Sequence, residues 1–200
     1  MSEIDEAQEA SGAPVLTTPE AWRGYLQNYD ERYLRTQDSD EDFEWMDDEA
    51  YEEFLEGAPL GRWLGEAPAS EAALAAAEER LGVRFPPSLR AFFLASNGWM
   101  RVNGWVDLVH PCERVTWMRE SDAGSRVIAI YDSIEGNEEY VELFNRSIEV
   151  AGGEDFWLLD PTDAGPDGEW TAHLFTPKYG DVEEFPSFAE LFDDGYTDME

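Results

Sequence analysis

The stretch ASEAALAAAEERLGVRFPPSLRAFFLASNG, residues 69–98, predicts two helices joined by a short extended link. Ser70 can cap the first helix, because its hydroxyl can accept a hydrogen bond from a free amide of the first turn. Gly82 can end that helix in the left-handed conformation. Phe85 precedes Pro86 and is expected to be extended, since proline disfavours a helical residue before it. The pattern is typical of a helix hairpin.

The second helix of this hairpin is predicted to bury an aromatic face. It begins after Pro87, and its apolar or small residues recur at the i, i+3, i+4 and i+7 positions of a helix: Leu89, Phe92, Phe93 and Ser96. Asn97 and Gly98 are expected to supply a left-handed cap at its end. Nothing in the hairpin points to catalysis.

Downstream of the hairpin, the pattern changes towards strands. Four segments rich in branched and aromatic residues are predicted strands: RVIAIYD (126–132), EYVELF (139–144), DFWLLD (155–160) and WTAHLF (170–175). Turn signals separate them at 135–137, 152–153 and 160–168. A closing helix is predicted from Ser187, with Glu190 completing a capping box. Together these elements predict an α+β fold, a twisted and mostly antiparallel sheet with surrounding helices.

Upstream of the hairpin, the sequence predicts an acidic helical N-terminal extension. Residues 1–14 are small and polar and are expected to be disordered. A helix is predicted behind Pro19, with one apolar face made of Trp22, Leu26, Tyr29 and Tyr33. Residues 38–56 form either an acidic helix or a disordered acidic run. We expect 15–58 to pack as an extension on a domain spanning 59–196.

The strongest compositional signal is a formal net charge of -33 over 200 residues. Such a chain repels nucleic acid and anionic membrane surfaces and attracts basic proteins and cations. A solubility role for the charge remains open. Cys112 is the only cysteine, so no disulfide within the chain is possible. The N-terminus lacks the features of a signal peptide, and no apolar run has the length of a membrane span, so we expect a cytoplasmic protein.

The candidate catalytic residues form no convincing constellation. Lys178 is the only lysine, and no glycine-rich phosphate loop accompanies it. His110 and Cys112 could share a strand face, but Pro111 separates them and no oxyanion-hole motif is near. His173 alternates within a predicted strand and is expected to be a half-buried sheet residue.

The acidic residues around position 165 also fail as a metal site. The run Asp163 to Gly168 looks like the start of a calcium loop, but the third position is Gly165 and the twelfth is Leu174, where a bidentate glutamate is needed. A polar turn between two strands is the better interpretation. The sequence therefore predicts no catalytic residue, no cofactor and no metal.

Several of these features together resemble the Smi1/Knr4 family of the SUKH superfamily. In the hairpin they are Glu78, the pair Leu81-Gly82, the pair Pro86-Pro87 and the pair Asn97-Gly98. Further along they are Trp117 behind PCERV, then VIAI, FWLLDP, GEW and FPSFAELF. The resemblance covers about residues 59–195 and is weaker for the extension from Trp22 to Leu55.

The resemblance implies an α+β fold without enzyme activity and without catalytic residues to transfer. Many bacterial members resemble immunity proteins that bind and neutralise toxins, whereas fungal members act as signalling scaffolds. The chain is therefore expected to be a non-enzymatic protein-binding domain. Its partner is either a cognate toxin, such as a basic nuclease, or an endogenous protein that it regulates.

A binding surface for a basic partner can be suggested from the acidic and aromatic residues. Carboxylates can imitate the phosphates that a nuclease binds, and tryptophan is enriched at binding hot spots. The candidates for partner binding are Glu135, Glu138, Glu139, Glu142, Asp163 and Asp167, with Trp99 and Trp105 as exposed anchors. The alternative is that the acids solvate strand edges and the tryptophans fill the core.

Overall fold

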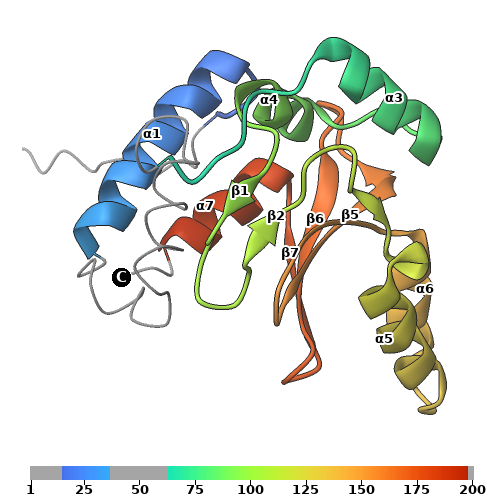
Figure 1. The fold of residues 1–200 in the computed structure, drawn as a ribbon. Coiled ribbons are helices and arrows are strands. Elements are labelled where there is room, and N and C mark those ends of the chain that lie inside the picture. The colour runs from blue at the N-terminus through green and yellow to red at the C-terminus, as the bar shows by residue number, and fades with distance from the viewer. Residues whose placement is uncertain (1–14, 37–62, 198–200) are drawn as a thin grey trace, which may run out of the picture.

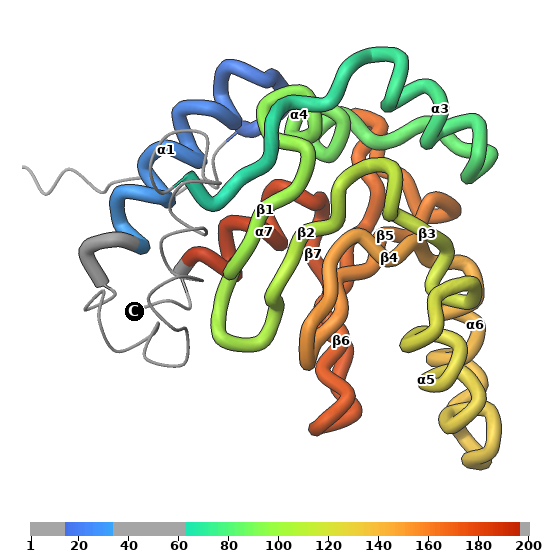
Figure 2. Tube along the Cα trace, viewed as in Figure 1, coloured from blue at the N-terminus to red at the C-terminus, as the bar shows by residue number. Residues whose placement is uncertain are grey.

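The computed structural model describes residues 15–36 and 63–197 (Figures 1 and 2). The predicted disordered segment 1–14 and the acidic run 38–56 lie outside the described residues. The described helices are α1 (Pro19–Thr36), α3 (Glu71–Leu81), α4 (Pro87–Ala95), α5 (Asp122–Asp132), α6 (Glu138–Arg146) and α7 (Phe188–Thr197), with a short 3-10 helix at Met118–Glu120.

One open sheet forms the centre of the molecule. Its strands are β1 (Trp99–Met100), β2 (Leu108–Val109), β3 (Thr116–Trp117), β4 (Ile148–Gly152), β5 (Phe156–Ala164), β6 (Trp170–Thr176) and β7 (Asp181–Phe185). The order is β1-β2-β4-β5-β6-β7, and β3 pairs with β4 beside β2. Every pairing among the named strands is antiparallel, so the predicted α+β fold is confirmed.

The sheet separates two hydrophobic clusters because successive side chains of a strand point to opposite faces. Trp157 and Leu159 of β5 belong to the larger cluster, which α1, α3, α4 and α7 cover. Phe156 and Leu158 belong to the smaller one, which α5 and α6 cover. Figure 1 shows α1, α4 and α7 on one side of the strands and α5 and α6 on the other.

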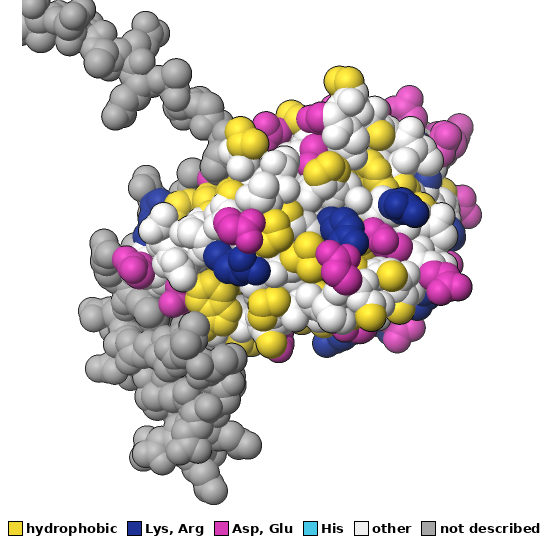
Figure 3. Space-filling model, turned by 90° about the horizontal axis from the view of Figure 1, so that it is seen from above, with side chains coloured by type: hydrophobic (Ala, Val, Ile, Leu, Met, Phe, Trp, Pro, Cys, Tyr) yellow, Lys and Arg dark blue, Asp and Glu magenta, His cyan; other side chains and the backbone are white. Residues whose placement is uncertain are grey.

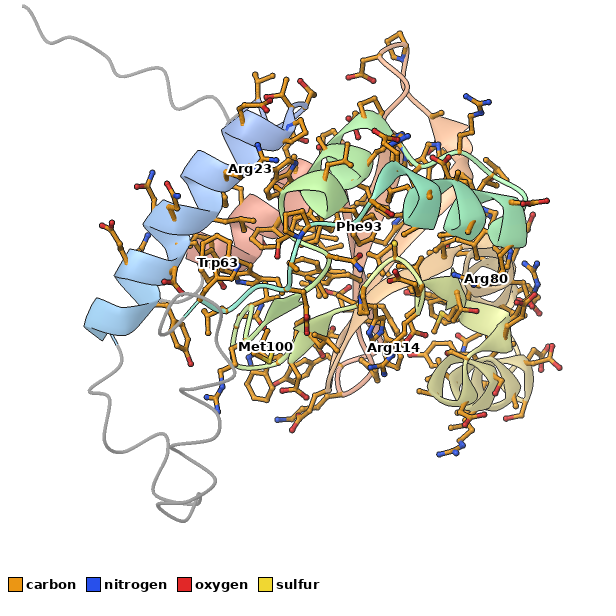
Figure 4. All side chains as sticks on the ribbon, turned by 45° about the horizontal axis from the view of Figure 1, so that its top comes forward. Arg23, Trp63, Arg80, Phe93, Met100 and Arg114 are labelled. Atoms are coloured by element: carbon orange, nitrogen blue, oxygen red, sulfur yellow. The ribbon has the colours of Figure 1, made fainter. Side chains whose placement is uncertain are left out.

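The helix α1 packs into the larger cluster through its predicted apolar face. Trp22 is buried, and its ring centroid lies 5.2 Å from those of Phe92 on α4 and Phe192 on α7. The indole N–H of Trp22 donates to the carbonyl of Ser88 at 2.9 Å. Trp63, labelled in Figure 4, packs edge-on against Trp99 at 4.9 Å. The N-terminal helix is thus part of the core.

Two of the predicted strands are helices, and these predictions were wrong. Residues 126–132 lie in α5, and residues 139–144 lie in α6. Ser121 caps α5 by accepting a hydrogen bond from the amide of Gly124 at 2.9 Å. Val127, Ile128 and Tyr131 then meet the smaller cluster at helical spacing. Packing on the sheet therefore outweighs the strand propensity of these branched residues.

The helix hairpin forms as predicted except at its end. Ser70 caps α3, and Gly82 ends it with φ 75°. The prediction of a left-handed cap at Asn97-Gly98 was wrong, because α4 ends at Ala95 and its C-cap, Ser96, is extended at φ -152°. The N-cap half of the predicted capping box of α7 is confirmed, since the amide of Glu190 donates to the hydroxyl of Ser187 at 3.3 Å.

Candidate functional site

The two residues considered as a nucleophile and base do not form such a pair. The thiol of Cys112 is fully buried, and burial raises its pKa to about 12, with the Glu113 carboxylate adding to the shift. The backbone N–H of Cys112 donates to Asn97. His110 instead faces Glu149, with its Nε2 3.4 Å from a carboxylate oxygen. A thiolate nucleophile is therefore strongly disfavoured at this site.

We expect the Cys112 thiol of the native chain to resist modification. With a pKa near 12, the thiolate fraction at about pH 8 is lower by about 1,000-fold than that of an ordinary cysteine. The rate of reaction with a disulfide reagent should fall at least as far, and it should recover when the chain is unfolded in concentrated urea. Equal rates in the two states would contradict this placement of Cys112.

Glu149 joins two parts of the fold that the sequence did not connect. It lies on β4 and is buried, and one carboxylate oxygen faces His110 while the other accepts a hydrogen bond from the Ser121 hydroxyl at 2.6 Å. The carboxylate thus lies between the serine and the histidine. A Ser-His-Asp triad needs the histidine in the middle, so this arrangement holds the start of α5 in place and does not activate a nucleophile.

A second buried carboxylate, Asp160, anchors α6 to the sheet. It is 1% exposed and accepts hydrogen bonds from Arg146 Nε at 2.6 Å and from the amide and hydroxyl of Thr162 at 2.9 and 2.7 Å. His173 lies on the neighbouring strand β6, as predicted, but it is buried. Burial lowers the pKa of His173, so its imidazole is neutral at neutral pH.

The residues that carry the family resemblance hold the backbone in place. Glu78 accepts a hydrogen bond from the amide of Phe85 at 3.1 Å and so fixes the extended link of the hairpin. Asn97 accepts from the amide of Cys112 and donates to Glu113, both at 2.9 Å. These side chains satisfy backbone and surface groups, and they are not free for chemistry.

Glu169, from the GEW motif, caps the second helix of the hairpin from a distance. The N-cap residue Pro86 has no side chain that could accept a hydrogen bond. Glu169 instead accepts from the amide and the hydroxyl of Ser88, at 2.7 and 2.6 Å. When Glu169 is ionised, the positive end of α4 offsets part of the cost of burying its charge. Burial raises the pKa of this carboxyl more than the two hydrogen bonds lower it.

Replacing Glu169 with glutamine should flatten the dependence of stability on pH. Because its pKa is higher in the folded chain, Glu169 stabilises the fold when protonated, and this contribution is lost as pH rises from the ordinary value of 4.5 through the folded value. The free energy of unfolding in urea should therefore decline less with rising pH in Glu169→Gln. In the exposed control Glu138→Gln, the free energy of unfolding should vary with pH as it does in the native chain. The same pH dependence in the native chain and both variants would contradict the raised pKa of Glu169.

The acidic residues predicted to form one patch are divided between two ends of the molecule. Glu138, Glu139 and Glu142 lie on α6, with Glu135 in the turn before it, whereas Asp163 is the penultimate residue of β5 and Asp167 lies in the β5–β6 turn. Arg146 lies between Glu142 and the sheet residue Asp160. In Figure 1 the α5–α6 turn and the β5–β6 turn point in opposite directions. The structure thus separates Glu135 from Asp167.

The β5–β6 connection is a polar turn, as its sequence predicts. The amide of Gly165 donates to the carbonyl of Glu169 at 2.8 Å, and the amide of Gly168 donates to the carbonyl of Gly165 at 3.0 Å. In the described part of the chain, no three histidine, cysteine, aspartate or glutamate residues are grouped to hold a metal ion. Within residues 15–36 and 63–197, no helix combines the length and apolarity that crossing a membrane requires.

The face above α1, α3 and α4 carries charges of both signs. Figure 3 shows basic and acidic side chains next to one another there, with apolar side chains between them. Arg23 pairs with Glu20 at 3.2 Å, and Arg90 of α4 lies 3.8 Å from Glu78 and also contacts Glu71. Arg80, labelled in Figure 4, donates to the carbonyls of Cys112 and Val115. This face therefore does not present uniform negative charge.

The two tryptophans expected as exposed anchors have different environments. Trp99 is completely buried against Tyr29 and Trp63, so the expectation of exposure was wrong for this residue and the core-filling alternative applies. Trp105 is 50% exposed in the loop between β1 and β2. Sequence reasoning missed Tyr179, which is 78% exposed, and Lys178, whose ammonium lies 5.3 Å from the Trp105 ring centroid. The only lysine of the chain lies next to a tyrosine, and this was the signal in the sequence that could have drawn attention to the pair.

Comparison with known families decides the classification. The sequence model of the SMI1 / KNR4 family (SUKH-1) matches residues 68–194. The chain belongs to this family. Proteins of the SMI1/KNR4 family are commonly immunity proteins of polymorphic toxin systems and are generally non-catalytic. A search of curated protein sequences found no match. The matched range of this SMI1/KNR4 chain contains the hairpin and the whole sheet, and α1 precedes it.

Proposed function

We propose that the chain is an immunity protein that binds and neutralises a basic toxin, with a nuclease as the best-fitting class. Membership of the SMI1/KNR4 family is the observation that carries this proposal. The formal net charge of -33 supports a basic partner, because long-range attraction accelerates the association of oppositely charged proteins. Nucleases are basic where they bind phosphate, and an acidic inhibitor can occupy that surface.

The buried polar groups support a binding role over catalysis. Glu149, Asp160 and Glu169 each accept hydrogen bonds that hold an element of the fold. Cys112 is buried with a raised pKa. The partners of these three carboxylates are groups that hold the fold together. Inhibition by occupying a toxin surface needs no catalytic group.

Co-expression tests the proposed function. The genes beside that of this chain are searched for a toxin domain, which is then produced in a sensitive bacterium with and without the full 200-residue chain. We expect the chain to restore growth and the purified pair to bind more weakly as salt rises, since salt screens the attraction. Unrelieved toxicity, or the absence of a toxin gene together with binding to an endogenous partner, would favour the regulatory alternative.

The exposed glutamates of α6 are proposed to accelerate this association. Glu138, Glu139 and Glu142 lie on one short helix that is far from the charge-paired face above α4. The triple variant with glutamine at these positions should lower the association rate several-fold at low salt and change the dissociation rate little. Asp163→Asn with Asp167→Asn, at the other end of the molecule, is the control pair.

A further inference from the structure

Three turns meet at the end of the sheet opposite the β5–β6 turn. They are the β1–β2 loop (101–107), the β4–β5 turn (153–155) and the β6–β7 turn (177–180), and Figures 1 and 2 show all three pointing the same way. The amide of Asp107 donates to the carbonyl of Gly152 at 3.2 Å, and the amide of Asp155 donates to the carbonyl of Trp105 at 3.0 Å. We call these three turns the sheet-end surface.

Two exposed aromatic rings flank one cation on this surface. Lys178 Nζ lies 5.3 Å from the ring centroid of Trp105 and 5.5 Å from that of Tyr179. The rings come from different turns, so the ammonium links the β1–β2 loop to the β6–β7 turn through cation–π attraction. Trp105 and Tyr179 are two of the few large apolar residues that the described chain leaves mostly exposed.

Hydrogen bonds hold the backbone that carries both rings. Asn103 accepts hydrogen bonds from the amides of Trp105 and Val106 at 2.9 and 2.8 Å. The carbonyl of Thr176 accepts from the amides of Tyr179 and Gly180 at 3.1 and 2.9 Å. A backbone that is already ordered loses little entropy on binding, so exposed aromatics on such turns are suited to act as anchors.

The three turns and their flanks carry more carboxylates than cations. The carboxylates in or next to the three turns are Asp107, Glu154, Asp155 and Asp181. Arg101 also lies in the β1–β2 loop, but its guanidinium donates to Tyr33 of α1 at 3.3 Å. Burial raises the pKa of Asp155, and the charge of Glu154 adds to this, while Lys178 lowers it. The three turns therefore carry two exposed rings and an excess of carboxylates, and we call these four carboxylates the acidic rim.

We propose that the sheet-end surface binds a basic protein, with Trp105 and Tyr179 against an apolar patch of the partner and the acidic rim against its lysines or arginines. An apolar centre with a charged rim is the usual anatomy of a protein interface. A second copy of the chain fits poorly, because both copies carry a net charge of -33. The assignment rests on the proposed function, since it takes its partner to be the basic toxin.

Photo-crosslinking in the full-length chain tests this assignment. p-Benzoylphenylalanine is introduced in place of Trp105, of Tyr179 or, as a control at the opposite end, of Asp163. Each protein is irradiated with the toxin domain of the co-expression test and separately with a lysate of the source cells, and the products are identified by mass spectrometry. We expect crosslinks to one basic protein from positions 105 and 179 and none from position 163.

The other outcomes would refute the assigned binding surface or the basic character of the partner, and they do so separately from the immunity function. Three results would refute the sheet-end surface as the binding site even if the toxin is neutralised. They are crosslinks from position 163 alone, no crosslink at all, and a crosslink to a second copy of the chain. A neutral or acidic protein crosslinked from 105 and 179 would overturn the partner chemistry. A basic endogenous protein crosslinked there, with unrelieved toxicity, would keep the surface and refute the immunity function.

Binding of the purified crosslinked partner gives the quantitative test. Trp105→Ala combined with Tyr179→Ala should raise Kd by about 100-fold or more, as expected for two hot-spot residues. The control pair Asp163→Asn and Asp167→Asn should change Kd less than about 3-fold. Lys178 is the only lysine, so its acetylation by an amine reagent reports on this surface, and the bound partner should protect it. Unchanged affinity in the aromatic variant, with Lys178 still reactive, would refute the assignment.

Discussion

Replacing Trp22 with alanine is expected to lower the free energy of unfolding by about 3–5 kcal/mol. The indole is completely buried between α4 and α7, where it contacts Phe92 and Phe192, and its N–H donates to Ser88. The substitution leaves a large cavity and a carbonyl without its partner. Urea unfolding followed by circular dichroism measures the loss.

An exposed tryptophan provides the control for this prediction. Trp105→Ala removes the same side chain from a half-exposed position, and its effect on the free energy of unfolding should be within about 0.5–1 kcal/mol. If Trp22→Ala were equally mild, α1 would not belong to the cooperative core. A large loss would show that the folding unit begins before residue 68, where the family match starts.

Replacing Asp160 with alanine is expected to cost about 2–3 kcal/mol of stability. The change removes the carboxylate that accepts hydrogen bonds from Arg146 and Thr162 and so releases α6 from β5. Breaking a fully buried ion pair costs more, but Arg146 is partly exposed and can regain water. The control Asp163→Ala removes an exposed carboxylate nearby and should cost less than about 1 kcal/mol.

The stabilisation that Asp160 gives the fold should be lost at low pH. Burial alone would raise the pKa of this carboxyl, but the hydrogen bonds from Arg146 and Thr162 lower it below its ordinary value of 3.8. The stabilisation is therefore complete above that value and is lost as pH falls through the folded pKa. The difference in free energy of unfolding between the native chain and Asp160→Ala should shrink in strong acid. A difference that stays constant with pH would contradict the lowered pKa of Asp160.

Local end signals made much of the helical structure predictable. Ser70, Gly82 and Ser187 mark helix ends in the sequence, and the structure confirms each of them. The apolar face of α1 was also predictable, because its large residues recur with the helical period. Such signals act within a few residues, so the sequence alone reveals them.

Long-range packing explains the elements that could not be predicted. The segment around Val127 and Ile128 has strand-forming residues but becomes a helix because it caps at Ser121 and packs on the sheet. Strands such as β1 and β2 have two residues each, too few for a periodic pattern. The exposure of Tyr179 and the burial of Trp99 depend on which turns meet in space, and composition does not determine this.

The unequal division of the core by the sheet has a consequence for hydrogen exchange. The smaller cluster relies on few side chains, among them Phe144 and Phe175, so the α5–α6 pair can separate from the sheet at a lower free energy than global unfolding. Its amides should exchange with deuterium earlier than those of β5 and β6. The central strands stay protected through their contacts with the larger cluster, and the molecule therefore has one rapidly exchanging side and one slowly exchanging side.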